Sequence, residues 1–358
     1  MKFLLVFILS LGLLTSCASN LWKKLDSKQA EEISEHKEFD EMVTIKSIPS
    51  EKETGAEIEI DVSEKDVGKS AAKKENARPA EPTIIKAKTD KNAKKTKQTK
   101  KKQKSKVSKE NNEMEVVAPD LENRPFKVGE KVTLELSYFN MPAGKLILET
   151  KPFVEVNGNK SYTFYVAVKT SSLFNMFYKV DNWAETYVDF KKLVPYSHSV
   201  RIRESKQVKD TRSYFDWEKN VANFWVKKID KADDDIKEEK TSWDLLPGSQ
   251  NVISAFFYQR VFDSAEIDKI HKFRVADSGQ NIEFKGKVIR REKINTIAGP
   301  FDTIVVKPEF TVNGSFKPVG DIFFWFTDDD QKLLVKLEAK IKIGAIVGEA
   351  AEIKRGKN

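Results

Sequence analysis

Few side chains in this sequence are of the kinds that carry out covalent chemistry. The chain has three histidines, His36, His198 and His271, and a single cysteine, Cys17. It contains no Gly-x-Ser-x-Gly elbow, no His-Glu-x-x-His zinc motif and no phosphate-binding glycine loop. His36 falls in a segment expected to be a tether, and His198 and His271 fall in strand-like segments, so we interpret them as ordinary surface or half-buried residues rather than bases. The sequence therefore predicts a protein that is not an enzyme and has no cofactor.

The carboxylates give no metal or catalytic motif. The aspartate runs at 233–235 and 328–330 lack the alternating ligands, the glycine and the closing glutamate of a calcium loop. We read both runs as solvated loop tips and expect no metal site. A carboxylate pair for hydrolysis could be assembled from Glu185 and Asp189, but spacing alone does not bring them together.

The surroundings of Cys17 indicate lipid attachment. After Lys2, the apolar run at 3–14 is too short to cross a hydrocarbon core of about 30 Å as a helix, and it suits the centre of a signal peptide. The quartet at 14–17, Leu-Thr-Ser-Cys, resembles a bacterial lipobox, in which the cysteine becomes the first mature residue and carries acyl chains. We expect a lipoprotein signal peptide at 1–16 and a membrane anchor at Cys17. A plain secretory peptide is the alternative.

The two residues after Cys17 bear on the membrane that holds the anchor. They are Ala18 and Ser19, so the aspartate that retains many such lipoproteins in the inner membrane is missing. This resemblance implies an envelope protein in the outer membrane that faces the periplasm.

Positive charge is concentrated in one segment. The chain has a net charge of +8, and the Lys-rich run at 86–109 includes Lys100, Lys101 and Lys102. Strand alternation puts Arg201 and Arg203 on one face. These five residues are candidates for contact with anionic lipid headgroups or a wall polymer, and a solvated spacer with an ordinary charged outer face is the alternative. Nucleic acid is not expected as a partner, because the run has no interleaved aromatics for base stacking and the chain is predicted to be exported.

One short segment is unusually apolar. Five of the six residues at 173–178 are large and apolar or aromatic, and they are Leu173, Phe174, Met176, Phe177 and Tyr178. They could plug the open end of a barrel, since large apolar residues are usually interior. They could instead line a groove for an acyl chain, a glycan or a partner protein, which makes them candidate ligand-facing residues.

The rest of the chain divides into a charged tether and a folded domain. Residues 17–119 show no sustained apolar periodicity, so we expect a long disordered tether there. Apolar and polar residues alternate in many short runs from 120 to 354, most clearly at 335–343, and Asn-Gly and Ser-Gly pairs fall between the runs. This predicts a mostly β domain, a curved antiparallel sheet, half-barrel or barrel of about twelve strands. The spacing of Ile253, Phe256, Phe257 and Val261 predicts one helix packed on the sheet near 322–326.

The order of several segments resembles a bacterial envelope family known only as domain of unknown function 3108. The segments that carry the resemblance lie at 128–145, 171–181, 251–260, 298–303 and 324–337. The resemblance implies a periplasmic β domain and no reaction. Such periplasmic domains resemble, more loosely, the half-barrels of lipoprotein-sorting and envelope-binding proteins, in which a helix lies across a curved sheet. The charged stretch at 227–240 departs from the family, and we interpret it as a loop insertion.

Three functions agree with these features. The β domain could bind an envelope component (lipid, glycan or wall polymer) without catalysis. It could be a structural or scaffolding domain that contacts a periplasmic protein. A cell-wall or lipid hydrolase without a recognisable signature is the third alternative. An apolar cavity between sheet and helix would favour the first function, and a filled interior with an exposed patch would favour the second.

Overall fold

Strands dominate the part of the chain that the computed structural model describes, which comprises residues 27–49, 124–230, 235–262, 266–312, 315–317, 321–341 and 343–357. Within these residues, sixteen strands form one antiparallel sheet. In chain order they are β1 (Ile45–Ser47), β2 (Val128–Tyr138), β3 (Met141–Val156), β4 (Asn159–Thr170), β5 (Asp181–Asp189), β6 (Pro195–Arg203), β7 (Gln207–Asp216), β8 (Val221–Asp230), β9 (Ile236–Asp244), β10 (Ile270–Asp277), β11 (Gln280–Thr296), β12 (Gly299–Val312), β13 (Ser315–Lys317), β14 (Ile322–Thr327), β15 (Leu334–Lys340) and β16 (Ala345–Lys357).

The helices of the described residues are short. They are α2 (Ser27–Ser34), α3 (Lys37–Met42), α4 (Ser172–Asn175), α5 (Val252–Tyr258) and the 3₁₀ turn η2 (Gln259–Val261). No helix in this part of the chain combines the length and the apolar character needed to cross a membrane.

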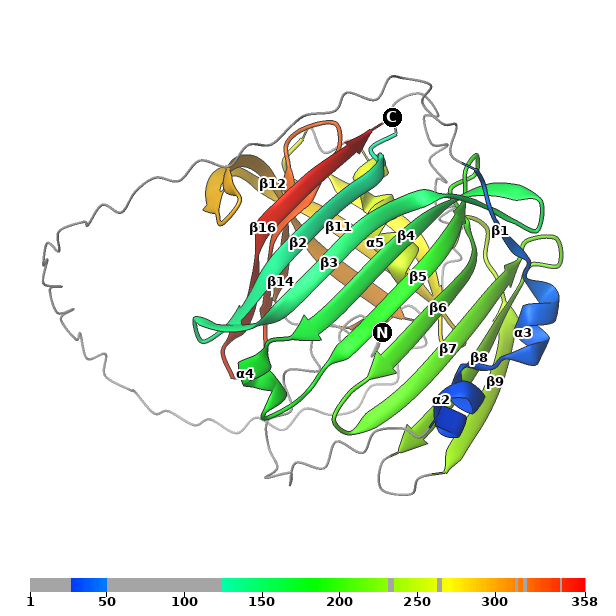
Figure 1. Cartoon of the computed structure of the whole chain (residues 1–358). Coiled ribbons are helices and arrows are strands. Elements are labelled where there is room, and N and C mark those ends of the chain that lie inside the picture. The colour runs from blue at the N-terminus through cyan, green and yellow to red at the C-terminus, as the bar shows by residue number, and fades with distance from the viewer. Residues whose placement is uncertain are drawn as a thin grey trace, which may run out of the picture. The chain divides into compact units, whose positions relative to one another are not determined.

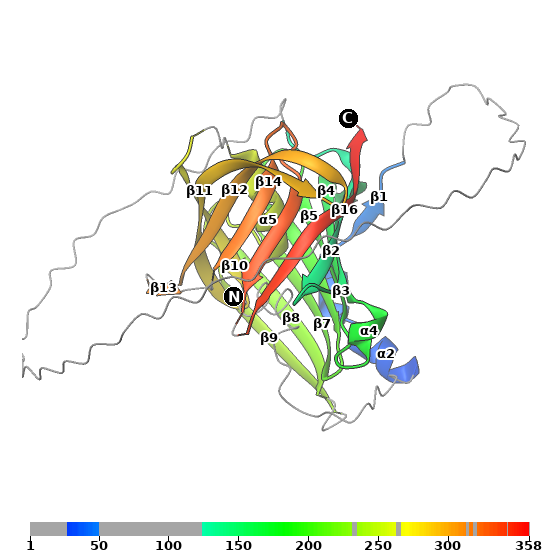
Figure 2. The same ribbon diagram turned by 90° about the vertical axis from the view of Figure 1, so that its left-hand side faces the viewer.

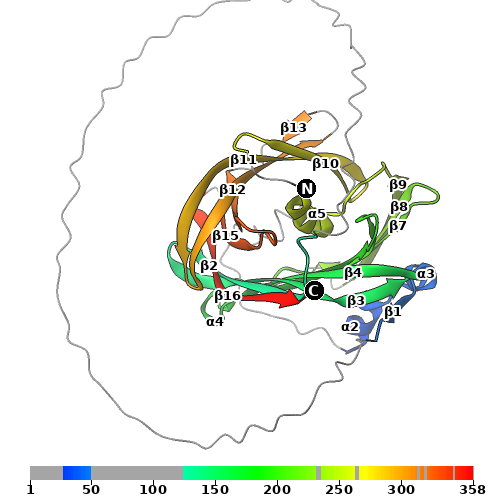
Figure 3. The same ribbon diagram turned by 90° about the horizontal axis from the view of Figure 1, so that it is seen from above.

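The sheet curls round on itself without closing (Figures 1 and 3). Its main path runs β10-β11-β12-β14-β15-β16-β2-β3-β4-β5-β6-β7-β8-β9, so β10 and β9 are its edges. The segment before α5 lies between these edges. Gln250 receives a backbone hydrogen bond from Ala276 of β10 (2.7 Å), and Asn281 of β11 donates to the carbonyl of Asp244 of β9 (3.0 Å). The predicted curved antiparallel sheet is confirmed.

Alternation of apolar and polar residues sets the two faces of each strand. In β15, Leu337 and Ala339 are buried, and Glu338 between them is partly exposed. The apolar run of β14 is more deeply buried: Phe324 lies on the side of α5, and the outward-facing Trp325 is covered by charged side chains from neighbouring strands. The strand expected at 322–326 is therefore confirmed, whereas the one expected at 335–343 ends at Lys340, and Ile343 lies exposed in the turn to β16.

The sheet has more strands than the sequence suggested. The charged stretch at 227–240, interpreted as an insertion loop, forms parts of β8 and β9. Lysines and glutamates occupy both faces of this hairpin, and Lys227 pairs with Glu238 on the neighbouring strand (3.0 Å). Within 227–240 only Ile229 and Ile236 are large and apolar, and a stretch this rich in charge gives little period-two apolar signal, so the sequence did not indicate these strands.

Helix α5 lies on the concave side of the sheet, as expected (Figures 2 and 3). Asn251 begins it with a capping box, because its side-chain oxygen accepts from the backbone N–H of Ile253 (2.9 Å) and Ser254 (2.8 Å). The ring of Phe257 stacks on Phe164 of β4 with centroids 4.2 Å apart. The helix thereby completes the core between the two halves of the sheet.

The N-terminal residues 27–47, named here the N-terminal strap, lie against the outer face of the sheet. The sequence predicts a tether throughout 17–119, but Ile33, Phe39 and Val43 of the strap are buried against the domain. Phe39 packs edge-on against Trp225 of β8 with ring centroids 5.9 Å apart. Polar contacts join the same surfaces, and His36 lies 3.3 Å from Asp210 of β7. The predicted tether at 50–119 lies outside the described residues.

Candidate binding surface at one rim of the sheet

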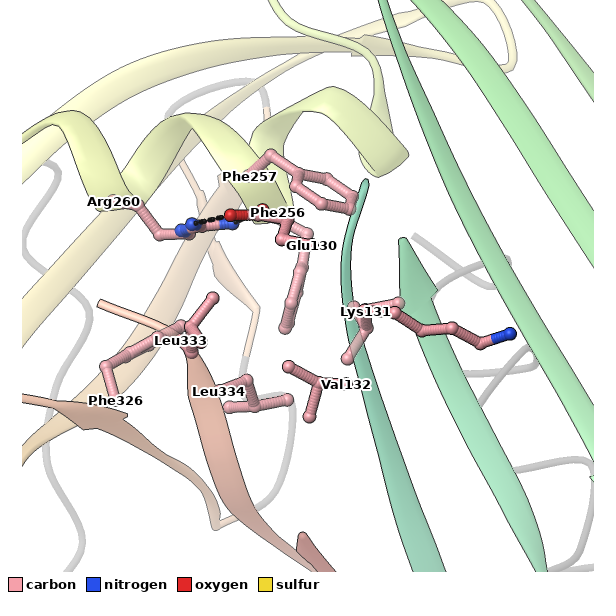
Figure 4. Close-up of a pocket in the computed structure, with 10 residues that line it drawn as sticks. Glu130, Lys131, Val132, Phe256, Phe257, Arg260, Phe326, Leu333 and Leu334 are labelled. Atoms are coloured by element: carbon pink, nitrogen blue, oxygen red, sulfur yellow. Dashed lines mark hydrogen bonds and ion pairs between the residues drawn. The ribbon is translucent and has the colours of Figure 1, made fainter. Parts of the chain in front are cut away.

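The interior around α5 is held by a buried ion pair (Figure 4). Arg260, at the end of α5, faces Glu130 of β2 with two nitrogen–oxygen contacts of 2.6 and 3.0 Å, and both side chains are almost fully buried. Thr150 also donates to Glu130 (2.9 Å), and Arg260 donates to the carbonyl of Gln331 (2.8 Å). Every charge here has partners, as buried charges require. The pair fixes the end of the helix to the sheet.

The two cavities beside α5 are small. One is lined by Val132, Phe256 and Leu334 among others, and the second lies between Arg260 and Gly286. Each offers roughly the space that one water molecule needs. Neither of these two described cavities has room for an acyl chain.

The residues considered as catalytic candidates are buried or bonded to separate partners within the protein. Burial lowers the pKa of His198, on the concave face of β6, to about 4, so its imidazole is neutral at neutral pH. Glu185 pairs with Lys151, whereas Asp189 accepts from the hydroxyl of Tyr196 (2.8 Å). Among the described residues, no group of three His, Cys, Asp or Glu side chains is arranged to hold a metal ion. The geometry of these residues offers no site for hydrolysis.

The five predicted ligand-facing residues lie on the connection between β4 and β5, where α4 forms a single turn. Leu173, Met176 and Phe177 are exposed, with 51, 63 and 66% of their surface accessible. Phe174 turns inward and is buried with Ala143 and Ile346. Tyr178 is half-buried and donates to Glu204 (2.8 Å); burial and this carboxylate raise its pKa. The segment thus splits into a buried base and an exposed apolar tip.

Neighbouring connections extend the exposed tip. The β2–β3 connection presents Phe139, β3 begins with Met141, and the β15–β16 connection presents Ile343, all three at least 46% exposed. Because β16, β2, β3 and β4 are consecutive neighbours in an antiparallel sheet, these connections lie at the same end of the sheet (Figure 1). We call this set the apolar rim, and its members are Phe139, Met141, Leu173, Met176, Phe177 and Ile343.

The two residues of the β2–β3 connection have a left-handed backbone conformation. Phe139 and Asn140 have φ angles of 49° and 59°. Asparagine tolerates this left-handed conformation, but for a phenylalanine it costs about 1–2 kcal/mol. The ring of Phe139 lies over Gly344, where an added Cβ would be 3.0 Å from it. A tight two-residue turn between β2 and β3 requires positive φ at both residues, which accounts for these angles.

Two of the cationic candidates, Arg201 and Arg203, lie on β6. Asp210, which is fully buried on the outer face, pairs with Arg212 and lies 3.3 Å from the Nε of Arg201. Arg203 donates to the backbone carbonyls of Ile202 (3.0 Å) and Lys209 (3.2 Å), and burial, with the nearby Arg201, lowers its pKa to about 10. These guanidinium groups already have partners within the protein, and their role towards an anionic polymer stays a prediction. The other candidates, Lys100, Lys101 and Lys102, lie outside the described residues.

Comparison of the sequence with models of protein families identifies the family of this chain. The model of a family described as "protein of unknown function (DUF3108)" matches residues 132–351. The chain belongs to the DUF3108 family. The match covers β2 to β16 and therefore contains α5 and the whole rim. Comparison with curated proteins gives no match.

Solved structures show distant likeness. A beta-barrel-like protein of domain of unknown function DUF1849 from Brucella abortus is 12% identical, with a TM-score of 0.43, covering 63% of this chain and 97% of that one. A protein provisionally described as a lipoprotein from Parabacteroides distasonis is 13% identical, with a TM-score of 0.29 and coverage of 65% and 98%. A third, provisionally described as an exported protein with a YmcC-like fold from Bacteroides fragilis, is 10% identical, with a TM-score of 0.30 and coverage of 64% and 98%.

Proposed function

We propose that this member of the DUF3108 family is a lipid-anchored protein of the outer membrane whose β domain binds an envelope component without catalysis, through the apolar rim. The anchor is Cys17, supported by the lipobox-like quartet before it and by the alanine and serine that follow. The domain would face the periplasm.

The single observation that carries the binding role is the exposure of the rim. Six large apolar side chains at or beside three separate connections gather at one end of the sheet. If each leaves about 100 Å² in water, the patch is on the order of 600 Å², the upper end of what a soluble monomer exposes. Surfaces of this size and composition are typical of contact with a protein, a ligand or a membrane.

The packed interior supports an external contact rather than an internal ligand. The described cavities beside α5 admit about one water each, and none of their lining residues belongs to the rim. The envelope component therefore meets the domain at its surface.

A crosslinking experiment in the bacterial host tests this proposal. A photoreactive benzoylphenylalanine replaces Phe177 in the full chain, and the control replaces Ile297, which is equally exposed (64% against 66%) but lies on the β11–β12 connection. Irradiation should give adducts at position 177 that are several times more abundant than those at position 297. Equal or absent adducts at position 177 would rule out the rim as the binding surface.

A further inference from the structure

The N-terminal strap decides how far a lipid on Cys17 holds the domain from its membrane. The strap is fixed to the sheet: Trp225 donates to Glu38 (2.9 Å), and Asn157 exchanges hydrogen bonds with Thr44 (2.7 and 2.9 Å). Nine residues lie between Cys17 and Ser27, the first residue of α2, and the ten steps from one to the other span at most about 36 Å when fully extended. A leash that ran to the start of β2 would be about ten times longer. The strap therefore keeps the anchor close to the domain.

The strap enters the domain at the same end as the rim. Ile33 of α2 packs on Val208, at the start of β7, and Ile229, at the end of β8. The β6–β7 connection beside them carries Glu204, which accepts hydrogen bonds from Tyr178 of the rim connection (2.8 Å) and Asn182 (2.8 Å). Figure 1 shows α2 and α4 towards the same end of the strands. The first described helix of the strap thus lies at the end of the sheet that carries the rim.

Several polar groups at the rim are hydrogen-bonded within the protein. In the turn at α4, the backbone N–H of Asn175 bonds to Ser171 (2.9 Å) and that of Phe177 to Phe174 (3.0 Å). The hydroxyl of Tyr138 donates to the carbonyl of Ile343 (2.8 Å). Each internal partner removes part of the cost of moving these polar groups out of water.

Charges behind the rim are balanced. Lys145 pairs with Glu135 (2.9 Å), Lys169 lies 3.7 Å from Asp181 and Lys340 lies 3.5 Å from Asp321. Lysines beside apolar tips suit a headgroup region, but paired lysines gain little from anionic lipid. Apolar insertion, rather than electrostatic attraction, is the contact that this surface can make.

We propose that the apolar rim inserts into the surface of the lipid bilayer that holds the anchor, so that the domain lies on its own membrane instead of hanging from a long tether. This inference rests on the proposed function and names the envelope component as the bilayer. The strap supplies proximity and orientation, and the rim supplies the contact.

Photolabelling from vesicles tests the contact. The mature chain is coupled through Cys17, its only cysteine, to maleimide-bearing lipid in phosphatidylcholine vesicles that contain a diazirine on an acyl chain. Adducts should map to the peptides with Phe139, Phe177 and Ile343 and be at least fivefold rarer on the peptide with Ile297. Raising the salt to about 0.5 M should change them less than about twofold. Adducts spread evenly over these peptides would overturn the proposal.

A strap variant tests the second half of the inference. Phe39→Ser removes the buried aromatic contact with Trp225, whereas Met42→Ser changes an exposed residue of the same helix. A leash about ten times longer lowers the effective concentration of the rim at the bilayer about 30-fold. Rim labelling should therefore fall severalfold in Phe39→Ser and stay unchanged in Met42→Ser. Unchanged labelling in both, with proteolysis confirming that the strap is released, would overturn the role of the strap.

The two proposals fail in distinguishable ways. Adducts at position 177 in cells, combined with no lipid adducts in vesicles, would leave the binding rim in place and show that its partner is a protein or glycan. Absence of adducts in both experiments would overturn the proposed function together with this inference.

Discussion

The buried pair of Arg260 and Glu130 should dominate the stability of the domain, because it joins α5 to the sheet inside the core. Replacing Arg260 by methionine leaves the carboxylate of Glu130 without its two guanidinium contacts of 2.6 and 3.0 Å. Removal of one partner from a buried pair costs about 3–5 kcal/mol. Glu130→Gln keeps the shape and the contact with Thr150 but loses the charge-assisted bonds, for a cost of about 2–3 kcal/mol.

Urea unfolding measures these costs as changes in the free energy of unfolding. The double variant Glu130→Met/Arg260→Met should be clearly less destabilised than the sum of the two single methionine variants, because no charge is left unpaired. Lys131→Met is the matched control: it lies next on the same strand, and its ion pair with Glu149 is surface-exposed (3.7 Å) and worth less than about 1 kcal/mol. If Arg260→Met costs no more than this control, the pair does not hold the helix.

Three further changes test other parts of the fold. Gly344→Ala should cost more than Gly158→Ala, by about 1–2 kcal/mol in thermal unfolding, because both have positive φ but only Gly344 lies under the ring of Phe139. His198, with its pKa of about 4, binds fewer protons folded than unfolded, so stability should fall by up to about 3 kcal/mol as the pH drops from about 6.5 to 4, and His198→Gln should remove that part of the slope. Asn251→Ala should cost about 1–2 kcal/mol in urea unfolding through loss of the α5 cap, and a change within error would contradict the capping role.

The elements with clear periodicity could be predicted from the sequence. The alternation in β15 and the spacing of Ile253, Phe256 and Phe257 in α5 each reflect one buried face. The charged part of the β8–β9 hairpin, at 227–240, and the strap were not predicted because neither has a run of regularly spaced apolar residues. In the strap, Ile33, Phe39 and Val43 are spread through a charged segment, and only the surface of the sheet that they cover makes them a core. Local pattern cannot reveal such tertiary contacts.

The candidate surface could be predicted only in part. The cluster around Phe177 is local, so the sequence indicates it, but its division into an inward Phe174 and an exposed tip depends on the turn at α4. Ile343 joins the rim because β16 pairs with β2, a contact between residues far apart in the sequence. For Arg201 the positive charge is visible in the sequence, but its neighbour, the buried Asp210, is revealed only by the register of β6 and β7.

The height of the domain above its membrane tests the central claim most directly. Neutron reflectometry on a supported bilayer that carries the mature chain anchored at Cys17 gives the protein density along the bilayer normal. With the strap in place and the rim inserted, protein density should begin within the headgroup layer, with no intervening water. A water layer tens of ångströms thick between the headgroups and the domain would contradict the account.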